Sequence, residues 1–164
     1  MKKFYGYFFC NKSLVADYIS WANENKYSFD ILTLLKSNPI PAHNGHHVSD
    51  TEYIILIRES STYFTSKGLE FDNYRKYYIT SCKKREHPAE KPLELIERFV
   101  RVSSKEGDVV FDGFLGSGTT AVACVRNNRK VIGCEIDKGY YEMSLRRVSE
   151  EQDKNEMGLF EGLI

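Results

Sequence analysis

The sequence DVVFDGFLGSGTTAVACVRNNRKVIGCEIDKGYY occupies residues 108–141, and its glycines separate a short apolar run from a helical pattern. The apolar run at residues 109–111 is typical of a buried strand. Glycines follow it at positions 113, 116 and 118. Because glycine permits tight turns and a close approach of the backbone to a ligand, this stretch predicts a binding loop after a strand.

The residues after the loop predict a helix and a second strand. Residues 119–126 favour a helix, and Thr119 or Thr120 can cap its start, where free backbone N–H groups favour a carboxylate. A second apolar run at residues 131–134 ends on Glu135, seventeen residues after the last glycine. A carboxylate in this position can bind both ribose hydroxyls of an adenosine. The whole unit is typical of a nucleotide-binding α/β domain.

Three classes of ligand compete for such a loop. A nucleoside triphosphate requires a Gly-Lys-Ser/Thr ending, and Thr119 stands where that lysine would be. A dinucleotide is a closer rival, since Gly116, Gly118 and Ala121 match the G-x-G-x-x-G/A pattern, but that pattern normally opens a domain. Here one helix and a tail follow Glu135, so we expect a permuted topology. S-adenosylmethionine fits best, with its carboxylate at the helix start and its ribose on Glu135.

Two further segments join the loop in a family pattern. HPAEKP at 87–92, DGFLGSGTT at 112–120 and GCEIDKGYY at 133–141 together resemble the β-class amino methyltransferases of DNA. The family usually has Asp-Pro-Phe where this chain has Asp-Gly-Phe at 112–114. The resemblance covers the chain apart from its acidic tail. It rests on three motifs in the expected order and spacing, which is more specific than one pattern alone.

The resemblance implies a fold, a cofactor and a reaction. The fold would be a Rossmann-like α/β sandwich with a mostly parallel sheet, permuted so that the cofactor strand comes late. The cofactor would be S-adenosyl-L-methionine, and the substrate double-stranded DNA. The reaction would move a methyl group to the N6 amino group of adenine or the N4 amino group of cytosine, in the setting of restriction and modification.

Several residues are expected to line the cofactor site. From the residues themselves we expect Asp112, Gly116, Gly118, Thr119 and Glu135, with Thr120 at the helix start. The resemblance adds Phe114, Ser117 and Asp137. It also adds His87 and Lys91, from the segment before the helix expected at Pro92. The alternative is a structural turn without a ligand, which is a costly use of so many glycines.

The expected catalytic segment is not found. The family uses Asp/Asn/Ser-Pro-Pro followed by an aromatic residue to accept the amino protons and to stack on a flipped base. The nearest string is NPIP at residues 38–41, which lacks the second proline and the aromatic residue. It instead resembles the family's later Lys-x-Asn-Pro-x-Pro loop near the target base. Asn38 is therefore a weak catalytic candidate.

In the family the catalytic tetrapeptide precedes the strand expected at residues 4–10. We therefore expect a methyltransferase that lacks its first strands: a fragment, a late start of a longer reading frame, or one half of a split enzyme. An apolar sheet edge would then be exposed, or covered by a complementing chain or a second copy. Binding of S-adenosylmethionine or DNA without catalysis, as a module that completes a partner chain, is the alternative function. A nicotinamide-dependent domain is a third.

Apolar patterns predict the other strands. Residues 4–10 are almost wholly aromatic and apolar, which favours a central strand buried on both faces. Residues 29–35 and 53–57 are expected to pair as an antiparallel edge.

The helices are predicted from apolar spacing. One is expected from Leu14 to Ala22, capped by Asn11 or Ser13, with Trp21 packed on the sheet. Another is expected to begin at Pro92. A last helix after Tyr141 would turn Arg146 and Arg147 outward, and a poorly ordered tail would follow from Glu150.

We expect a methyltransferase domain at residues 1–149 and an acidic tail at 150–164. Within the domain, residues 1–59 would lie on the target-base side, 60–86 would form a short basic target-recognition insertion, and 87–149 would bind the cofactor. Residues 60–85 hold six basic and two acidic residues, among several tyrosines. The expected DNA contacts are Lys36, Asn38, Arg75, Lys76, Lys83, Lys84 and Arg85. A solvated loop is the alternative.

Composition limits the possible partners, location and metal sites of the chain. The chain has 164 residues and a formal net charge of zero, so overall charge predicts no partner. No signal peptide or membrane-spanning run is visible, and the four cysteines form no C-x-x-C pair, which favours a cytoplasmic location. Cys10, Cys124 and Cys134 are expected to fill apolar cores. His43, His46 and His47 could bind zinc, but no cysteine is near and no metal site is predicted.

Overall fold

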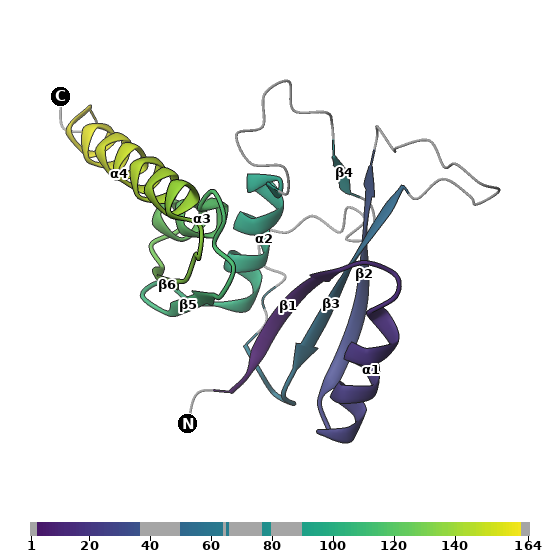
Figure 1. The fold of residues 1–164 in the computed structure, drawn as a ribbon. Coiled ribbons are helices and arrows are strands. Elements are labelled where there is room, and N and C mark those ends of the chain that lie inside the picture. The colour runs from purple at the N-terminus through teal and green to yellow at the C-terminus, as the bar shows by residue number, and fades with distance from the viewer. Residues whose placement is uncertain (1–2, 37–49, 64, 66–76, 80–89, 162–164) are drawn as a thin grey trace, which may run out of the picture. The chain divides into compact units, whose positions relative to one another are not determined.

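A computed structural model describes the chain at residues 3–36, 50–63, 65, 77–79 and 90–161. For Lys36 and for residues 77–79 and 155–161 only the backbone is described. These residues form two compact units, one from residues 1–83 and one from residues 84–164. Figure 1 labels the helices and strands of both.

The first unit is a sheet of four strands with helix α1 (Figure 1). Its elements are β1 (Tyr5–Cys10), α1 (Val15–Glu24), β2 (Ser28–Lys36), β3 (Thr51–Arg58) and β4 (Tyr77–Ile79). The strand order is β1-β3-β2-β4, with β3 antiparallel to β1 and β2, and β4 parallel to β2. The three strands predicted here and the antiparallel pairing of the last two are confirmed. The short strand β4 lies in the stretch that was predicted to be loop.

Strand β3 supplies the core of the first unit because strands flank it on both sides. Its residues 54–57 are buried in succession. Ile55 and Ile57 share one face and pack with Ala22 of α1. The half-buried residues around this cluster are mostly aromatic: Phe8, Cys10, Val15, Tyr18, Tyr27, Phe29 and Tyr53.

Strand β1 is an edge strand, so the prediction of a central strand buried on both faces was wrong. All six of its residues are half-buried, and within the described part of the chain it pairs with β3 alone. Its aromatic residues lie on both faces: Phe8 stacks on Tyr18 of α1 with ring centroids 5.1 Å apart, whereas Tyr5 and Tyr7 point to the opposite face and pack against each other at 5.5 Å. The apolar run predicted the strand correctly, but it carries no information about which strands lie beside it in the sheet.

The start and end of α1 also differ from expectation. Neither Asn11 nor Ser13 caps the helix, because Ser13 donates its backbone N–H and its hydroxyl to Oδ1 of Asn11, at 3.0 and 2.6 Å. The helix begins after Leu14 with no side-chain cap. Trp21 is exposed and stacks on Tyr27, with centroids 5.4 Å apart, so it does not pack the helix on the sheet as predicted.

The second unit contains the predicted strand–loop–helix–strand sequence. Its elements are α2 (Leu93–Ser103), β5 (Val109–Asp112), α3 (Thr119–Arg126), β6 (Lys130–Gly133) and α4 (Lys138–Glu161). Strands β5 and β6 are parallel neighbours, and α3 connects them and packs against α2 and α4 (Figure 1). Helix α2 follows Pro92, as predicted, and buries Leu95, Ile96, Phe99, Val100 and Val102.

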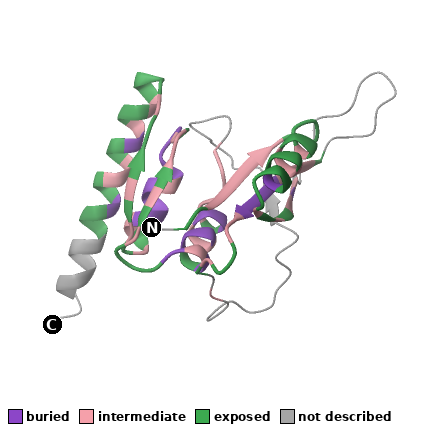
Figure 2. Ribbon diagram, turned by 90° about the horizontal axis from the view of Figure 1, so that it is seen from below, coloured by how far each residue is buried: buried purple, intermediate pink, exposed green. Residues whose placement is uncertain are grey.

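Helix α4 is longer than the sequence predicted. It continues through Glu161, so the expectation of a poorly ordered tail from Glu150 was wrong. Most of its described residues are exposed, with isolated buried positions at Ser144 and Glu151 (Figure 2). No helix in the described residues is both long and apolar enough to cross a membrane.

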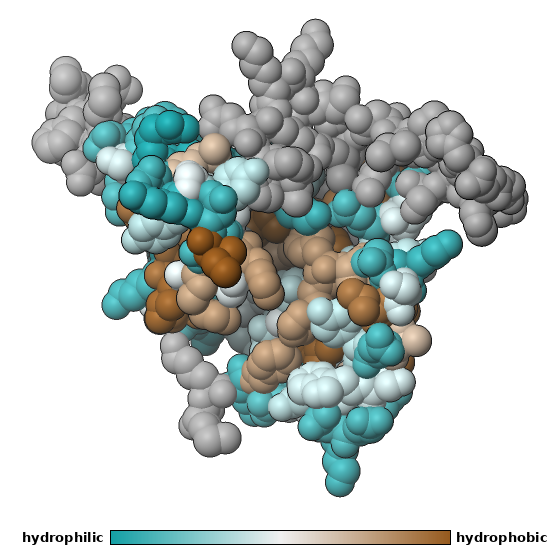
Figure 3. Space-filling view, viewed as in Figure 1, coloured by the Kyte–Doolittle hydropathy of each residue, from teal (hydrophilic) through white to brown (hydrophobic). Residues whose placement is uncertain are grey.

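One face of the β5–β6 pair is apolar and exposed. Phe111 is paired with Ile132, so both side chains lie on the same face, together with Val109. They are 68%, 57% and 49% exposed. Figure 3 shows hydrophobic surface in this region. Among the described strands, β5 pairs with β6 only, which agrees with the prediction of an unpaired apolar sheet edge.

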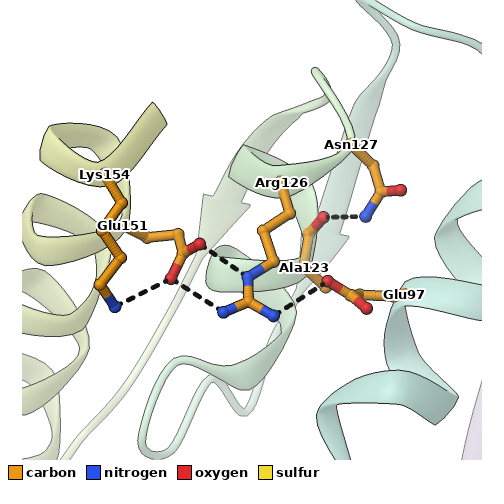
Figure 4. A network of polar contacts seen from close by, with 6 residues as sticks. All are labelled: Glu97, Ala123, Arg126, Asn127, Glu151 and Lys154. Carbon is orange, nitrogen blue, oxygen red and sulfur yellow. Dashed lines mark hydrogen bonds and ion pairs between the residues drawn. The ribbon is translucent and has the colours of Figure 1, made fainter. Parts of the chain in front are cut away.

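A network of charged side chains ties α4 to α3 and α2 (Figure 4). Arg126 donates from Nε and Nη2 to the two carboxylate oxygens of Glu151, at 2.7 and 3.1 Å. It also donates from Nη1 to Glu97 of α2 at 3.5 Å. Glu151 is nearly buried, and the hydrogen bonds from Arg126 hold the pKa of its carboxyl below the usual range. This forked ion pair explains why the helix persists beyond Glu150.

Replacing Arg126 with methionine should lower the free energy of unfolding by about 2 kcal/mol, because it leaves the nearly buried Glu151 without its forked partner. Urea denaturation measures the change. The control is Arg146→Met, which removes an exposed pair with Glu150 at 3.9 Å and should cost less than about 0.5 kcal/mol. Equal losses in the two variants would contradict the assigned role.

The same pair should make stability depend on pH. Because the folded-state pKa of Glu151 is lowered, its contribution is present above the ordinary glutamate value of 4.5 and is lost as pH falls through the folded-state pKa. The wild type should therefore lose more stability than Arg126→Met on acidification from neutral pH to below 4.5. Parallel curves of unfolding free energy against pH would contradict this.

Candidate functional site

The loop between β5 and α3 is shaped by glycines in left-handed conformations. Gly116 and Gly118 have φ angles of 54° and 83°. Before them, Asp112 accepts the N–H of Phe114 on Oδ1 at 3.0 Å, which closes the first turn. Gly118 occupies the cap position of α3, so neither Thr119 nor Thr120 caps the helix as predicted. Both threonines instead lie in its first turn, where backbone N–H groups have no partner within the helix.

Glu135 holds the loop from the end of β6. Its Oε2 accepts the N–H of Gly116 at 2.7 Å, and its Oε1 accepts the N–H of Asp137 at 2.9 Å. These hydrogen bonds, first that from Asp137 and then that from Gly116, lower the pKa of the carboxyl and keep it ionised. Since each carboxylate oxygen has more than one lone pair, both can also accept a hydrogen bond from a hydroxyl group.

Helix α4 lies against the other side of the loop. A Cβ atom at Gly118 would lie 2.7 Å from Cβ and 2.9 Å from Cα of Ser144, which is fully buried. Only glycine fits there, for reasons of both space and backbone angle. The contact also requires a small residue at position 144. Ser144 was not among the residues predicted from the sequence, although a serine on the inner side of an amphipathic helix is a usable signal of close packing.

Arg147 is a second contact from α4. Its Nη1 donates to the carbonyl oxygen and to the hydroxyl oxygen of Ser117, at 2.9 and 2.8 Å. It also forms an ion pair with Glu90 at 3.0 Å. The prediction that Arg147 points outward was therefore wrong. Helical periodicity alone could not show that the buried Ser117 of the glycine loop lies against this side of α4.

Other features of the site point to a ligand. Phe114 and Ile136 are almost fully exposed, at 94% and 102%, although both flank the polar loop and the Glu135 carboxylate in sequence. Thr119 is buried, and its Oγ1 has no hydrogen-bond partner among the described residues. Two exposed apolar side chains and a buried hydroxyl without a hydrogen-bond partner are unfavourable unless a bound molecule covers the former and bonds to the latter.

The outcome differs among the other predicted residues. Asp137 accepts the N–H of Tyr140 on Oδ1 at 2.9 Å and so starts α4. Lys91 is half-buried in the segment before α2. Cys124 is buried as predicted, and burial raises the pKa of its thiol to about 11, whereas Cys134 is exposed and the prediction of a core role for it was wrong.

Many predicted contacts cannot be placed. His87, Asn38, Arg75, Lys76, Lys83, Lys84 and Arg85 lie outside the described residues, as do His43, His46 and His47. Lys36 ends β2, but its side chain is not described. Within the part of the chain that the structure describes, no group of three or more acidic, histidine or cysteine residues could hold a metal ion.

Comparison with known proteins identifies the family. The profile of the DNA methylase family of the N6/N4 type matches residues 3–146. The chain therefore belongs to this family.

Individual relatives are longer than this chain. The type II methyltransferase M2.MboI of Moraxella bovis is 33% identical over 142 residues, which cover 77% of this chain and 52% of the relative. M.HpaI of Haemophilus parainfluenzae is 43% identical over 76 residues, covering 45% and 24%. The chain thus spans about half, or less, of the length of these curated relatives.

Solved structures agree with the fold. The M1.HpyAVI–SAM complex has a TM-score of 0.74 and 28% identity, covering 87% of this chain and 73% of its own. The cytosine-N4-specific PvuII DNA methyltransferase has a TM-score of 0.68 and 18% identity, covering 84% and 60%, and supports the fold alone. The predicted Rossmann-like methyltransferase fold is thereby confirmed.

Replacing Gly118 with alanine should lower the free energy of unfolding by about 3 kcal/mol, because left-handed strain and overlap with Ser144 add together. Gly107→Ala is the matched control. Gly107 also has a left-handed φ, of 79°, but nothing lies within 4 Å of the added Cβ, so strain alone should cost about 1 kcal/mol. Equal losses in urea denaturation would show that the loop does not pack on α4.

Proposed function

We propose that this chain binds S-adenosyl-L-methionine at the β5–α3 loop, as part of an enzyme that methylates the exocyclic amino group of adenine or cytosine in double-stranded DNA. The observation that carries the proposal is the placement of Glu135. Its ionised carboxylate is fixed by N–H groups of Gly116 and Asp137, directly beside a glycine loop and the start of a helix.

The residues present fit the cofactor. The oxygens of Glu135 retain acceptor capacity for the two ribose hydroxyls. The first turn of α3 and the unpartnered hydroxyl of Thr119 suit a carboxylate. The exposed side chains of Phe114 and Ile136 suit the flat faces of adenine. When bound, the cofactor would supply an electrophilic methyl group on a sulfonium sulfur.

The remaining predicted residues of this site, Asp112, Ser117, Thr120, Asp137, His87 and Lys91, are included in the proposal. Asp112 and Asp137 shape the turns on either side of it. The proposed DNA contacts are Lys36, Asn38, Arg75, Lys76, Lys83, Lys84 and Arg85, since their charge suits phosphate binding.

A complementing strand is the second part of the proposal. The free edge of β5 would pair with a strand that ends in the family's Asp/Asn/Ser-Pro-Pro-aromatic tetrapeptide, from a longer form of the protein or from another chain. The pairing of β5 supports this, because among the described strands it has β6 as a neighbour on one side only. The greater length of the relatives also supports it.

Isothermal titration with S-adenosylmethionine tests the cofactor site. Glu135→Gln should weaken binding at least about tenfold, since it removes the charge that accepts the loop N–H groups and the ribose hydroxyls. Glu142→Gln, an exposed position paired with Lys138 on α4, should bind like the wild type. Equal affinities of the two variants, or binding of a nicotinamide dinucleotide instead, would contradict the proposal.

Transfer of a labelled methyl group to unmethylated DNA then tests catalysis. Binding without transfer by the chain alone, with transfer restored by a segment carrying the tetrapeptide, is the expected result. Transfer by the chain alone would show that it holds the proton acceptor itself, and Asn38 would become the first candidate. Binding without transfer even in the complemented form would favour a non-catalytic module that completes a partner.

A further inference from the structure

Arg147 connects two segments that lie far apart in the chain. Its guanidinium pairs with Glu90, which precedes α2, and donates to both oxygen atoms of Ser117 in the glycine loop. The side chains of Arg147 and Glu90 are each 23% exposed, and Ser117 is buried. Hydrogen bonds from a partly desolvated guanidinium are stronger than neutral ones, so this contact restrains the loop.

We propose that Arg147 is a positioning residue for the cofactor site: it fixes the glycine loop in its ligand-accepting conformation and joins it to the Glu90 segment. The inference rests on the proposed binding of S-adenosylmethionine to this loop. Arg147 does not need to touch the ligand. Its effect would be to remove, before binding, the conformational freedom that two left-handed glycines bring to the loop.

The hydrogen bonds of the loop support this role. The peptide unit between Ser117 and Gly118 is held at both ends, since its oxygen accepts from Arg147 and its N–H donates to Leu115 at 2.9 Å. The preceding turn is held by Glu135 through the N–H of Gly116. Arg147 and Glu135 thus hold consecutive turns of one loop. Without Arg147, rotation of the Ser117–Gly118 peptide would break one hydrogen bond instead of two.

A purely structural role in docking α4 is the alternative. That helix has a separate anchor about one turn further on, where Arg126 forms hydrogen bonds with Glu151. The two anchors allow a clean comparison. Loss of the Arg126 anchor should reduce stability without affecting the loop, whereas loss of Arg147 should affect the loop most.

The experiment measures the Kd of S-adenosylmethionine by titration calorimetry for the wild-type chain and three variants. Arg147→Met should bind about tenfold more weakly, the effect of losing one charge-assisted contact. Arg126→Met should be less stable but bind with wild-type affinity. Arg146→Met, which changes the exposed neighbour on the same helix, should match the wild type in both respects.

Wild-type affinity in a folded Arg147→Met variant would overturn the inference and leave the proposed function intact. Failure of the wild type itself to bind would overturn the proposed function, and the inference with it. If Arg147→Met does not fold, Arg147→Lys decides the matter. Its single ammonium group keeps the charge but cannot reproduce the guanidinium geometry, so its affinity should fall at least about threefold. Wild-type affinity of that variant would overturn the inference.

A second measurement needs no ligand. Amide hydrogen exchange of Gly118 in the free protein should be faster in Arg147→Met than in Arg126→Met, because only the former releases the Ser117–Gly118 peptide. Equal exchange rates in the two variants would overturn the inference.

Discussion

The carboxylate of Glu135 accepts one N–H from the glycine loop and one from the turn that leads into α4, so it joins three parts of the second unit. A neutral side chain would form weaker hydrogen bonds with these two N–H groups. The same hydrogen bonds lower the pKa of the carboxyl, so the group stays charged to more acidic pH than an ordinary glutamate. Loop shape and the proposed ligand binding therefore depend on the same atoms, so a change at this residue is expected to affect both.

Helix α4 packs against the glycine loop. Ser144 leaves room for Gly118, and Arg147 binds Ser117 one turn later. The Arg126–Glu151 pair, further along, holds the helix against α3 within the acidic stretch that begins at Glu150. A stretch whose composition suggests a disordered tail is thus helical, because tertiary contacts outweigh local preference.

The exposed face of β5 and β6 is unusual for an α/β protein, and among the described strands β1 and β5 each have a neighbour on one side only. Relatives in the DNA methylase family are longer, and this chain matches about half or less of their length. Cofactor motifs are intact, whereas the family's catalytic tetrapeptide is not found in the sequence. These facts support the proposal that the chain binds the cofactor and is completed by further polypeptide, in preference to a new active site.

The sequence by itself determined the order of strands and helices apart from β4, the glycine loop and the acid at the end of β6. These depend on local patterns: apolar periodicity, turn residues and the spacing of motifs. It did not determine that β1 is an edge strand, that Cys134 is exposed or that Trp21 lies outside the core, since apolarity says nothing about neighbours. The roles of Ser144 and Arg147 were decided only by tertiary structure. Arg147 and Ser117 are thirty residues apart, and only the packing of α4 on the loop brings them together.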